Sequence, residues 1–406
     1  MMSDSQAMFR QKSGFTLIEL VVVMALFITV LLISASAFNT ILQNATKLFK
    51  SEESNIEGIV GLEMFRHDLQ QAGYGLYTEP FTYASEAASS LPALNNDSPN
   101  NVPRPLVFLT KTLDGTMSVD SNTPLVNSDY ISIKGTSLSR APAAQKWTYL
   151  NIDTKTVTPH SWPSAAENFA TSDNVVVLLK QFDTAQRSTL IPNQTGGFSY
   201  NFGNSVFANL SSQMSGMYAV YGIDSVNLRF PFNRTDYFVA TPASAAQLPS
   251  YCAPGTGVLY KATVNQADGN LTYLPVLDCV LGMQVVLGWD TTGTGLIDTW
   301  SSSDGSAVNG LATTSVVQSA LGSANNNSLS TVPNIRSSLK MVKVYVLAQN
   351  GRKDPDYIST SPLQVCDTGE TSLTLPVGLT LTPAQLSYRW KLYRIVVRPK
   401  NLLANQ

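Results

Sequence analysis

An uninterrupted apolar run near the N-terminus is the strongest pattern in the sequence. Residues 15–38 read FTLIELVVVMALFITVLLISASAF and contain one charged side chain, Glu19. At about 1.5 Å per residue, a helix over this run would be roughly 36 Å long, which is enough to cross the hydrocarbon core of a bilayer. Arg10 and Lys12 precede the run, and such basic residues stay on the cytoplasmic side of a membrane. The pattern therefore predicts a single transmembrane helix with a cytoplasmic N-terminus.

The helical pattern continues beyond the apolar run. Apolar residues recur three or four positions apart, the spacing of an amphipathic helix, at Ile41, Leu42, Leu48, Phe49, Ile56, Ile59, Val60, Leu62, Phe65 and Leu69. No proline occurs before Pro80, and Gly73 is suited to a left-handed helix cap. We therefore predict an N-terminal helical segment at residues 15–75, whose later part packs on the domain that follows. Gly58 and Gly61 would allow another backbone to approach closely, or are weak points that the helix tolerates.

From residue 76 onward, short apolar runs alternate with turn residues, which is typical of antiparallel strands. The clearest runs are residues 105–110, 129–134, 175–180, 217–223, 225–230, 258–263, 271–276, 282–289, 341–349 and 388–398. The sequence Asp268-Gly269-Asn270 between two of these runs predicts a β-hairpin. We therefore predict an α+β fold, in which a long N-terminal helix packs on a large, mainly antiparallel β domain at residues 76–406.

The composition favours an exported protein without enzymatic activity. Charged residues make up 13% of the chain and the net charge is −2, so no bulk attraction to nucleic acid is expected. The two histidines, His67 and His160, lie far apart in the sequence. We find none of the motifs typical of serine hydrolases, phosphate-binding loops or zinc enzymes. We interpret His67 and Asp68 as solvated helix residues rather than as a catalytic pair.

Cysteines occur only after the predicted transmembrane helix, at Cys252, Cys279 and Cys366. If this part of the chain is exported, one disulfide is expected and one thiol is left over. Three pairings are possible. We favour Cys252–Cys279, because the hairpin predicted around Gly269 would bring these two residues together.

Residues 290–298, Asp-Thr-Thr-Gly-Thr-Gly-Leu-Ile-Asp, resemble a calcium-binding loop. Asp290 and Asp298 would supply carboxylate ligands, with hydroxyl oxygens at alternate positions and a glycine at the sixth. Threonines replace the usual second and third carboxylates, and Ser301 occupies the twelfth position. We therefore favour the alternative, a glycine-rich turn without metal, and expect no other cofactor.

Basic residues gather near the C-terminus, at Arg389, Lys391, Arg394, Arg398 and Lys400. Such a strand could contact DNA or an acidic partner. We favour a solvated edge or face of the sheet, where charges deter unwanted strand pairing.

Residues 13–20, Ser-Gly-Phe-Thr-Leu-Ile-Glu-Leu, resemble the processing site of type IV prepilins. The resemblance implies that residues 1–14 are a leader peptide, that prepilin peptidase cuts between Gly14 and Phe15, and that Phe15 is N-methylated. It also implies that Glu19 pairs with the N-terminal amine of a neighbouring subunit during filament assembly. An amine and a carboxylate inside an apolar bundle relieve each other's desolvation penalty.

The alternative for this segment is an ordinary secretory signal peptide, with a small-residue cleavage site at Ala35-Ser36-Ala37. The apolar run is longer than the apolar region of a usual signal peptide. It also contains Glu19, a carboxylate that is costly in lipid unless it has a partner. Both features favour the prepilin interpretation.

The end of the helix and the last strands resemble PilW-type minor pilins, at Gln71-Ala72-Gly73-Tyr74 and at residues 388–402. The resemblance implies a minor pilin that acts in initiation or tip assembly of a type IV pilus. It would be inserted in the inner membrane with a periplasmic domain, and later be part of the extracellular pilus. Its partners would be other pilins, prepilin peptidase and the inner-membrane assembly platform. Two alternatives stay open: a minor pseudopilin of a type II secretion system, and a pilus-tip adhesin or DNA-uptake subunit.

Overall fold

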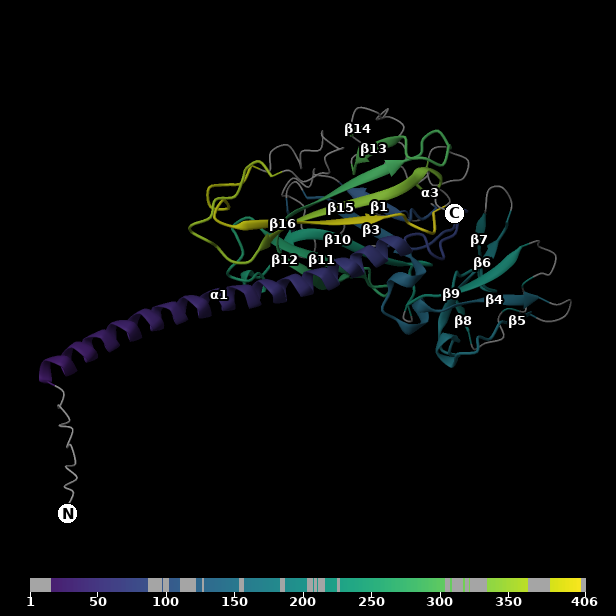
Figure 1. The fold of residues 1–406 in the computed structure, drawn as a ribbon. Helices are drawn as coiled ribbons and strands as arrows, with labels where there is room; N and C mark the ends of the chain where they lie inside the picture. Colours follow the sequence, from purple (N-terminus) through teal and green to yellow (C-terminus); the bar gives the residue numbers. More distant parts are fainter. Residues whose placement is uncertain are drawn as a thin grey trace, which may run out of the picture. The chain divides into compact units, whose positions relative to one another are not determined.

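The structure of the protein, a computed structural model, is described over most of the chain. The described residues are 16–86, 97, 102–109, 122–125, 128–152, 157–182, 187–202, 207, 210, 216–224, 227–303, 307–308, 317, 321, 334–363 and 380–402. The chain divides into two compact units, Met1–Ser54 and Asn55–Gln406. The long helix α1 (Leu17–Gln71) contributes to both units (Figure 1). The second unit contains the described strands, so the predicted α+β fold is confirmed.

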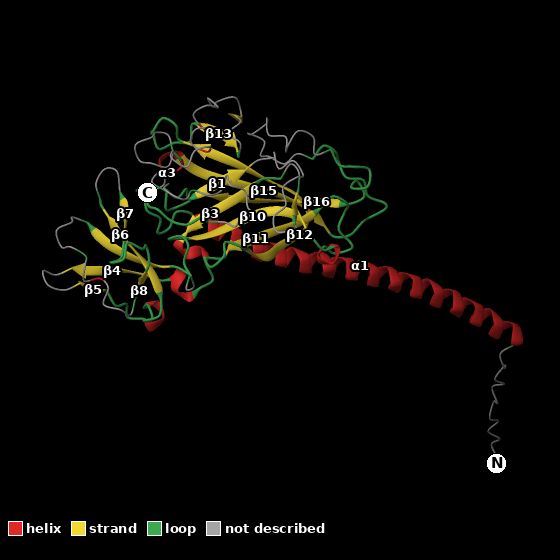
Figure 2. Cartoon of the chain, turned by 180° about the vertical axis from the view of Figure 1, so that it is seen from behind, coloured by secondary structure: helices red, strands yellow, loops and turns green. Residues whose placement is uncertain are grey.

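Two antiparallel sheets make up the β structure of the second unit (Figure 2). Among the described residues, the larger sheet has ten strands: β1 (Leu106–Leu109), β2 (Thr123–Pro124), β3 (Tyr130–Gly135), β10 (Asn233–Thr241), β11 (Gly257–Val264), β12 (Leu271–Trp289), β13 (Thr299–Ser302), β14 (Ala307–Val308), β15 (Leu339–Asn350) and β16 (Arg389–Val397). The smaller has six: β4 (Trp147–Ile152), β5 (Val157–Pro159), β6 (Asn174–Lys180), β7 (Ser188–Ile191), β8 (Tyr200–Asn201) and β9 (Met217–Gly222). A short helix, α3 (Ile335–Ser338), precedes β15.

The smaller sheet is an insertion between two neighbouring strands of the larger one. The chain leaves β3 at Gly135 and returns to β10 at Asn233, and these two residues are direct partners in the antiparallel pairing of β3 with β10. Residues 136–232 are therefore an insertion between two paired strands of the larger sheet. The two sheets share a buried core, which includes Val176 and Leu178 of β6 and Phe238 of β10.

The C-terminal part of α1 packs on the larger sheet. Leu62, Phe65 and Leu69 are buried in the same core as residues of β10, β11, β12 and β15. The ring of Phe65 stacks on that of Tyr237, with centroids 3.9 Å apart. The helix ends as predicted, because Gly73 adopts a left-handed backbone conformation with φ of 85° and its N–H donates to the carbonyl of Lys134.

At Gly61, α1 packs closely against the sheet. A Cβ atom added at this position would lie 2.6 Å from the carbonyl oxygen of Val276 in β12. We expect Gly61→Ala to lower the free energy of unfolding by about 1–3 kcal/mol, because a backbone atom must move and the gain in helix propensity is smaller. Chemical denaturation of the purified protein measures this loss. Gly282→Ala in β12 is the matched control, since an added Cβ would meet nothing within 4 Å; equal losses in the two variants would contradict the close packing of α1.

The interpretation of Asp68 as a solvated residue is wrong. Its carboxylate is buried against the sheet, where it accepts hydrogen bonds from the Tyr237 hydroxyl at 2.6 Å and from Lys261 Nζ at 2.5 Å. Burial, reinforced by this carboxylate, raises the pKa of Tyr237 well above its usual value. The side chain of His67, by contrast, is exposed. Asp68 therefore fixes the helix to β10 and β11 rather than facing solvent.

A network of buried charges holds the segment before β1 onto the larger sheet. It contains equal numbers of acidic and basic side chains: Glu86, Asp97, Asp236, Arg104, Lys134 and Arg234. Lys134 Nζ lies 2.7 Å from Glu86 Oε2 and 2.6 Å from Asp97 Oδ2. Arg104 Nε donates to Asp97 at 2.7 Å. Arg234 donates to Asp236 at 2.7 Å and to Glu86 at 3.1 Å. We call these residues the buried charge network.

The strand predicted at residues 225–230 is wrong in its described part. Residues 227–230 form no strand, because the amides of Arg229 and Phe230 donate to the side-chain oxygen of Gln266 instead of to a neighbouring strand. The strand lies further on, as β10, which begins at Asn233.

Candidate assembly site

The first part of α1 presents an apolar surface with no protein cover. Within the described residues, Leu17–Asn39 is the one helical stretch long and apolar enough to span a membrane. The described side chains from Thr16 to Leu42 are all exposed. Apolar side chains exposed over this length require a lipid or protein environment, because water around them is unfavourable.

The helix begins with a reciprocal cap between Thr16 and Glu19. The Thr16 backbone N–H and hydroxyl donate to Glu19 Oε2 at 3.0 and 2.8 Å, and the Glu19 N–H donates to the Thr16 hydroxyl at 3.4 Å. This is a capping box, in which two otherwise unpaired donors of the first turn are satisfied. Thr16 was not singled out from the sequence, although the spacing Thr-x-x-Glu before an apolar run is the known signal for such a cap.

Of the predicted processing and assembly residues, the structure places Glu19. Gly14 and Phe15, the predicted cleavage and methylation positions, lie outside the described residues. The capped carboxylate of Glu19 sits near the start of an apolar helix, where the helix dipole favours a negative charge. Its pairing with a neighbour's amine stays a prediction.

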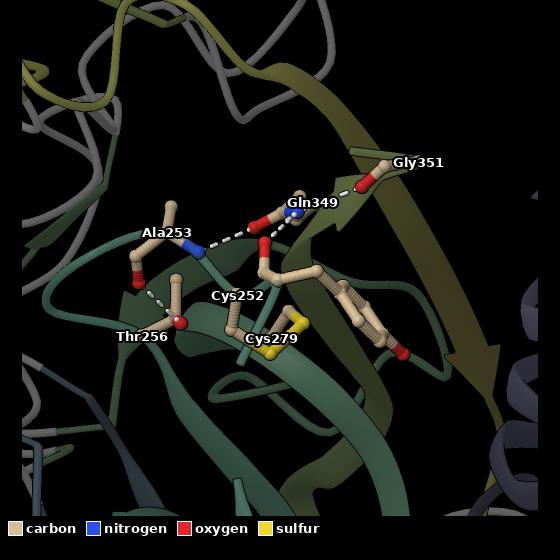
Figure 3. The surroundings of a disulfide bond; sticks show 7 residues. Cys252, Ala253, Thr256, Cys279, Gln349 and Gly351 are labelled. Carbon is tan, nitrogen blue, oxygen red and sulfur yellow. Dashed lines mark hydrogen bonds between the residues drawn. A yellow bond between two sulfur atoms is a disulfide. The ribbon is translucent and has the colours of Figure 1, made fainter. Parts of the chain in front are cut away.

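Cys252 and Cys279 form a disulfide, with Cα atoms 5.0 Å apart (Figure 3). This is the pairing favoured from the sequence, and Cys366 lies outside the described residues. The bond closes a loop over a sequence separation of 27 residues that contains the β11–β12 hairpin. Closing a loop of this length stabilises the folded state by about 3.5 kcal/mol in the chain-entropy model.

Gln349 of β15 fixes the segment that carries Cys252 (Figure 3). Its side-chain oxygen accepts from the Ala253 N–H at 2.6 Å, and its side-chain nitrogen donates to the carbonyls of Tyr251 and Gly351. The disulfide joins the segment between β10 and β11 to β12, and the Gln349 amide joins the same segment to the end of β15.

The calcium-like loop satisfies its carboxylates with its own chain. Asp298 accepts from the backbone N–H groups of Thr291 and Thr292, and Asp290 accepts from those of Thr294 and Gly295. Burial raises the pKa of Asp298, but the hydrogen bonds from Thr291 and Thr292 outweigh it and hold the pKa below its usual value. Across the described part of the chain, no group of three or more His, Cys, Asp or Glu side chains is placed to hold a metal ion. The geometry is that of a self-capped turn, and the absence of bound calcium, which the sequence favours, stays a prediction.

The basic C-terminal strand lies at an edge. β16 pairs with β15, and with no other described strand. Arg394, Arg398 and Lys400 are exposed, while Ile395 and Val397 are buried between them. This alternation is that of an edge strand with one solvated face.

Comparison with known proteins identifies the N-terminal segment. The family model described as the prokaryotic N-terminal methylation motif matches residues 9–35. No curated protein and no solved structure matches the chain. The matched residues include Gly14, Phe15, Glu19 and the first turns of α1. This motif belongs to structural rather than enzymatic proteins, which assemble with other pilins and associate with a membrane. Together with the apolar helix and the β domain, the motif supports a type IV pilin-like or pseudopilin-like protein.

Proposed function

We propose that this protein is a PilW-like minor pilin of a type IV pilus. The observation that carries the proposal is the methylation motif at residues 9–35, which runs directly into an exposed apolar helix that contains Glu19. In this proposal, prepilin peptidase cuts between Gly14 and Phe15, and Phe15 is N-methylated. The mature protein then takes part in initiation or tip assembly of the filament.

Assembly depends on two interactions of α1. In the membrane, Thr16 caps the Glu19 carboxylate within one subunit. In the filament, the same carboxylate pairs with the N-terminal amine of a neighbouring subunit, and the apolar faces of adjacent helices pack together. The pairing gives both ionic groups a partner in a medium of low dielectric, where an unpaired charge is strongly disfavoured.

The proposed location follows from the charges around the apolar helix and from the disulfide. Arg10 and Lys12 favour a cytoplasmic N-terminus and a periplasmic domain. The disulfide between Cys252 and Cys279 suits an oxidising compartment such as the periplasm. The partners would be prepilin peptidase, the inner-membrane assembly platform, and other major and minor pilins.

The size of the β domain favours a minor subunit. The second compact unit extends from Asn55 to Gln406 and contains two sheets. Such a bulky domain is more easily placed at a tip than repeated along a filament. A minor pseudopilin of a type II secretion system has the same N-terminal features and is the second candidate.

Deleting the gene in its native host distinguishes the two candidates. The pilus proposal expects a marked loss of surface pili, seen by electron microscopy, with normal release of secreted enzymes. Complementation with the wild-type gene restores the pili. Normal piliation together with enzymes retained in the periplasm would instead assign the protein to the secretion system.

A further inference from the structure

We infer that the inserted sheet carries a binding surface for a neutral saccharide, formed by aromatic side chains of the β4–β5 hairpin. The rings belong to Trp147 and Tyr149 of β4 and to His160 and Trp162, which directly follow β5. We call these four side chains the aromatic ladder. The inference concerns the surface of residues 136–232 and does not depend on whether the protein enters a filament.

The aromatic ladder consists of two cross-strand pairs. Tyr149 and His160 are stacked, with ring centroids 4.6 Å apart, and the His160 N–H donates to the Tyr149 carbonyl. Trp147 and Trp162 form the next pair, with centroids 5.2 Å apart. The rings of His160 and Trp162 meet edge to face at 4.8 Å. All four rings therefore stand in one contiguous row.

This row lies on a face of β4 that protein does not fully cover. Leu150, on the opposite face of the strand, is 6% exposed and belongs to a buried core, whereas Trp147 is 39% exposed. The other three rings are half-buried. In both views of the molecule, β5 lies at the margin of the inserted sheet (Figures 1 and 2). Large aromatic side chains that are partly exposed at the edge of a sheet contribute less to stability than buried ones. Their position therefore favours a role in binding.

Hydrogen bonds hold the ladder in place. The Trp162 indole N–H donates to the Trp147 carbonyl at 2.9 Å, which fixes the orientation of the ring. Asn168 accepts from the Trp162 N–H at 2.7 Å and donates to its carbonyl at 2.8 Å. A surface that is ordered before binding loses little conformational entropy on binding.

The chemistry around the rings selects the class of ligand. Glu167 is the one Asp, Glu, Lys or Arg in residues 147–152 and 157–168, and Lys146, next to Trp147, pairs with Asp173 at 3.5 Å. The sequence between β4 and β5 adds Asp153 and Lys155, one charge of each sign. Thr158, the partner of Asn151 in the pairing of β4 with β5, is exposed on the same face as Tyr149 and offers a hydroxyl group. The electron-rich faces of aromatic rings attract the C–H groups of a pyranose ring, and neighbouring hydroxyls can bond its hydroxyls. Single-stranded nucleic acid also stacks on aromatic rings, but it requires a basic groove that these residues do not supply.

The test is binding of neutral hexasaccharides to the full-length protein in nanodiscs, since common detergents carry sugar head groups. The probes are maltohexaose, cellohexaose and chitohexaose, measured by calorimetry and tryptophan fluorescence. We expect at least one to bind, and Trp147→Ala to weaken its binding about tenfold or more, because it removes the most exposed ring of the ladder. Trp147→Phe, which keeps a smaller ring, should lose less. Phe182→Ala is the matched control, since Phe182 is 74% exposed on the same inserted segment but is not part of the ladder.

Three results would overturn the inference. The first is that none of the three hexasaccharides binds at millimolar concentration. The second is undiminished binding in Trp147→Ala, or in Trp147→Phe if the alanine variant does not fold. The third is that oligo(dT) binds the wild type more tightly than the saccharides do and is lost in the same variants, which would assign the ladder to nucleic acid.

Discussion

Changing Glu19 to Ala is expected to leave a protein that inserts in the membrane but does not enter filaments. The apolar run of α1 is unaffected by this change, so insertion should be normal. On the proposed mechanism, however, the neighbouring subunit's amine would lose its partner in an apolar bundle. We expect the amount of the protein in sheared filaments to fall at least about tenfold, because an unpaired buried charge is strongly disfavoured.

Two further variants make this result specific. Glu19→Gln keeps the size of the side chain and its acceptor oxygen but removes the charge, and it should fail like alanine. Glu63→Ala removes an exposed acid of the same helix, which pairs with Arg66, and should assemble normally. Immunoblots of the membrane and filament fractions measure how much of each variant is inserted in the membrane and how much enters filaments. Filament levels of Glu19→Gln equal to wild type would remove the charge-pairing argument.

Changing Lys134 to Met is expected to destabilise the folded domain by about 3–5 kcal/mol, because it breaks a buried ionic group and leaves an unbalanced negative charge. Lys134 is fully buried and contacts both Glu86 and Asp97. Methionine fills a similar volume, so the loss reports the charge rather than a cavity. Chemical denaturation of the full-length protein, followed by circular dichroism, measures it.

The pH dependence of stability provides a second readout of the same variant. Burial raises the pKa of Asp97, but the charges of Lys134 and Arg104 outweigh it and hold the pKa below its usual value. A depressed pKa in the folded state stabilises the protein above the unfolded-state pKa, and this contribution is lost as the pH falls through the folded-state pKa. In Lys134→Met the depression is smaller, so Asp97 contributes less stability at neutral pH, and the fall in the free energy of unfolding on acidification should be smaller than in the wild type.

Arg66→Met is the control for this prediction. It removes an exposed cation of α1 that pairs only with Glu63, so no measurable change in stability is expected. If Lys134→Met lowers the free energy of unfolding as little as Arg66→Met does, the buried charge network does not hold the segment around Glu86 and Asp97.

The long helix and its end could be predicted from the sequence because their signals are local. The apolar run, the absence of proline and Gly73 each depend on neighbouring residues alone, and the structure has α1 from Leu17 to Gln71. Strands with alternating or continuous apolar residues, such as β6 and β15, were also predictable. The choice of Cys252 and Cys279 followed from the hairpin between them.

Strand β10 and the role of Asp68 could not be predicted because they depend on distant partners. β10 begins Asn-Arg-Thr-Asp, a polar sequence that reads as a turn. Its charges are tolerated in the interior because Arg234 pairs with Asp236 and with Glu86, 148 positions away in the sequence. Asp68 likewise has its partners in β10 and β11. The inserted sheet was predicted only in part: β6 and β9 correspond to predicted strands, whereas β4, β5, β7 and β8 were not predicted.

On the proposed function, the chain is a prepilin that is processed at Gly14 and anchored by the helix that follows. The mass of the N-terminal peptide of the protein isolated from its native membrane tests this processing directly. We expect a mature protein that begins at Phe15 and carries one methyl group on its N-terminal amine. A mature N-terminus at Phe38, after Ala35-Ser36-Ala37, would identify a secretory signal peptide and would exclude prepilin processing.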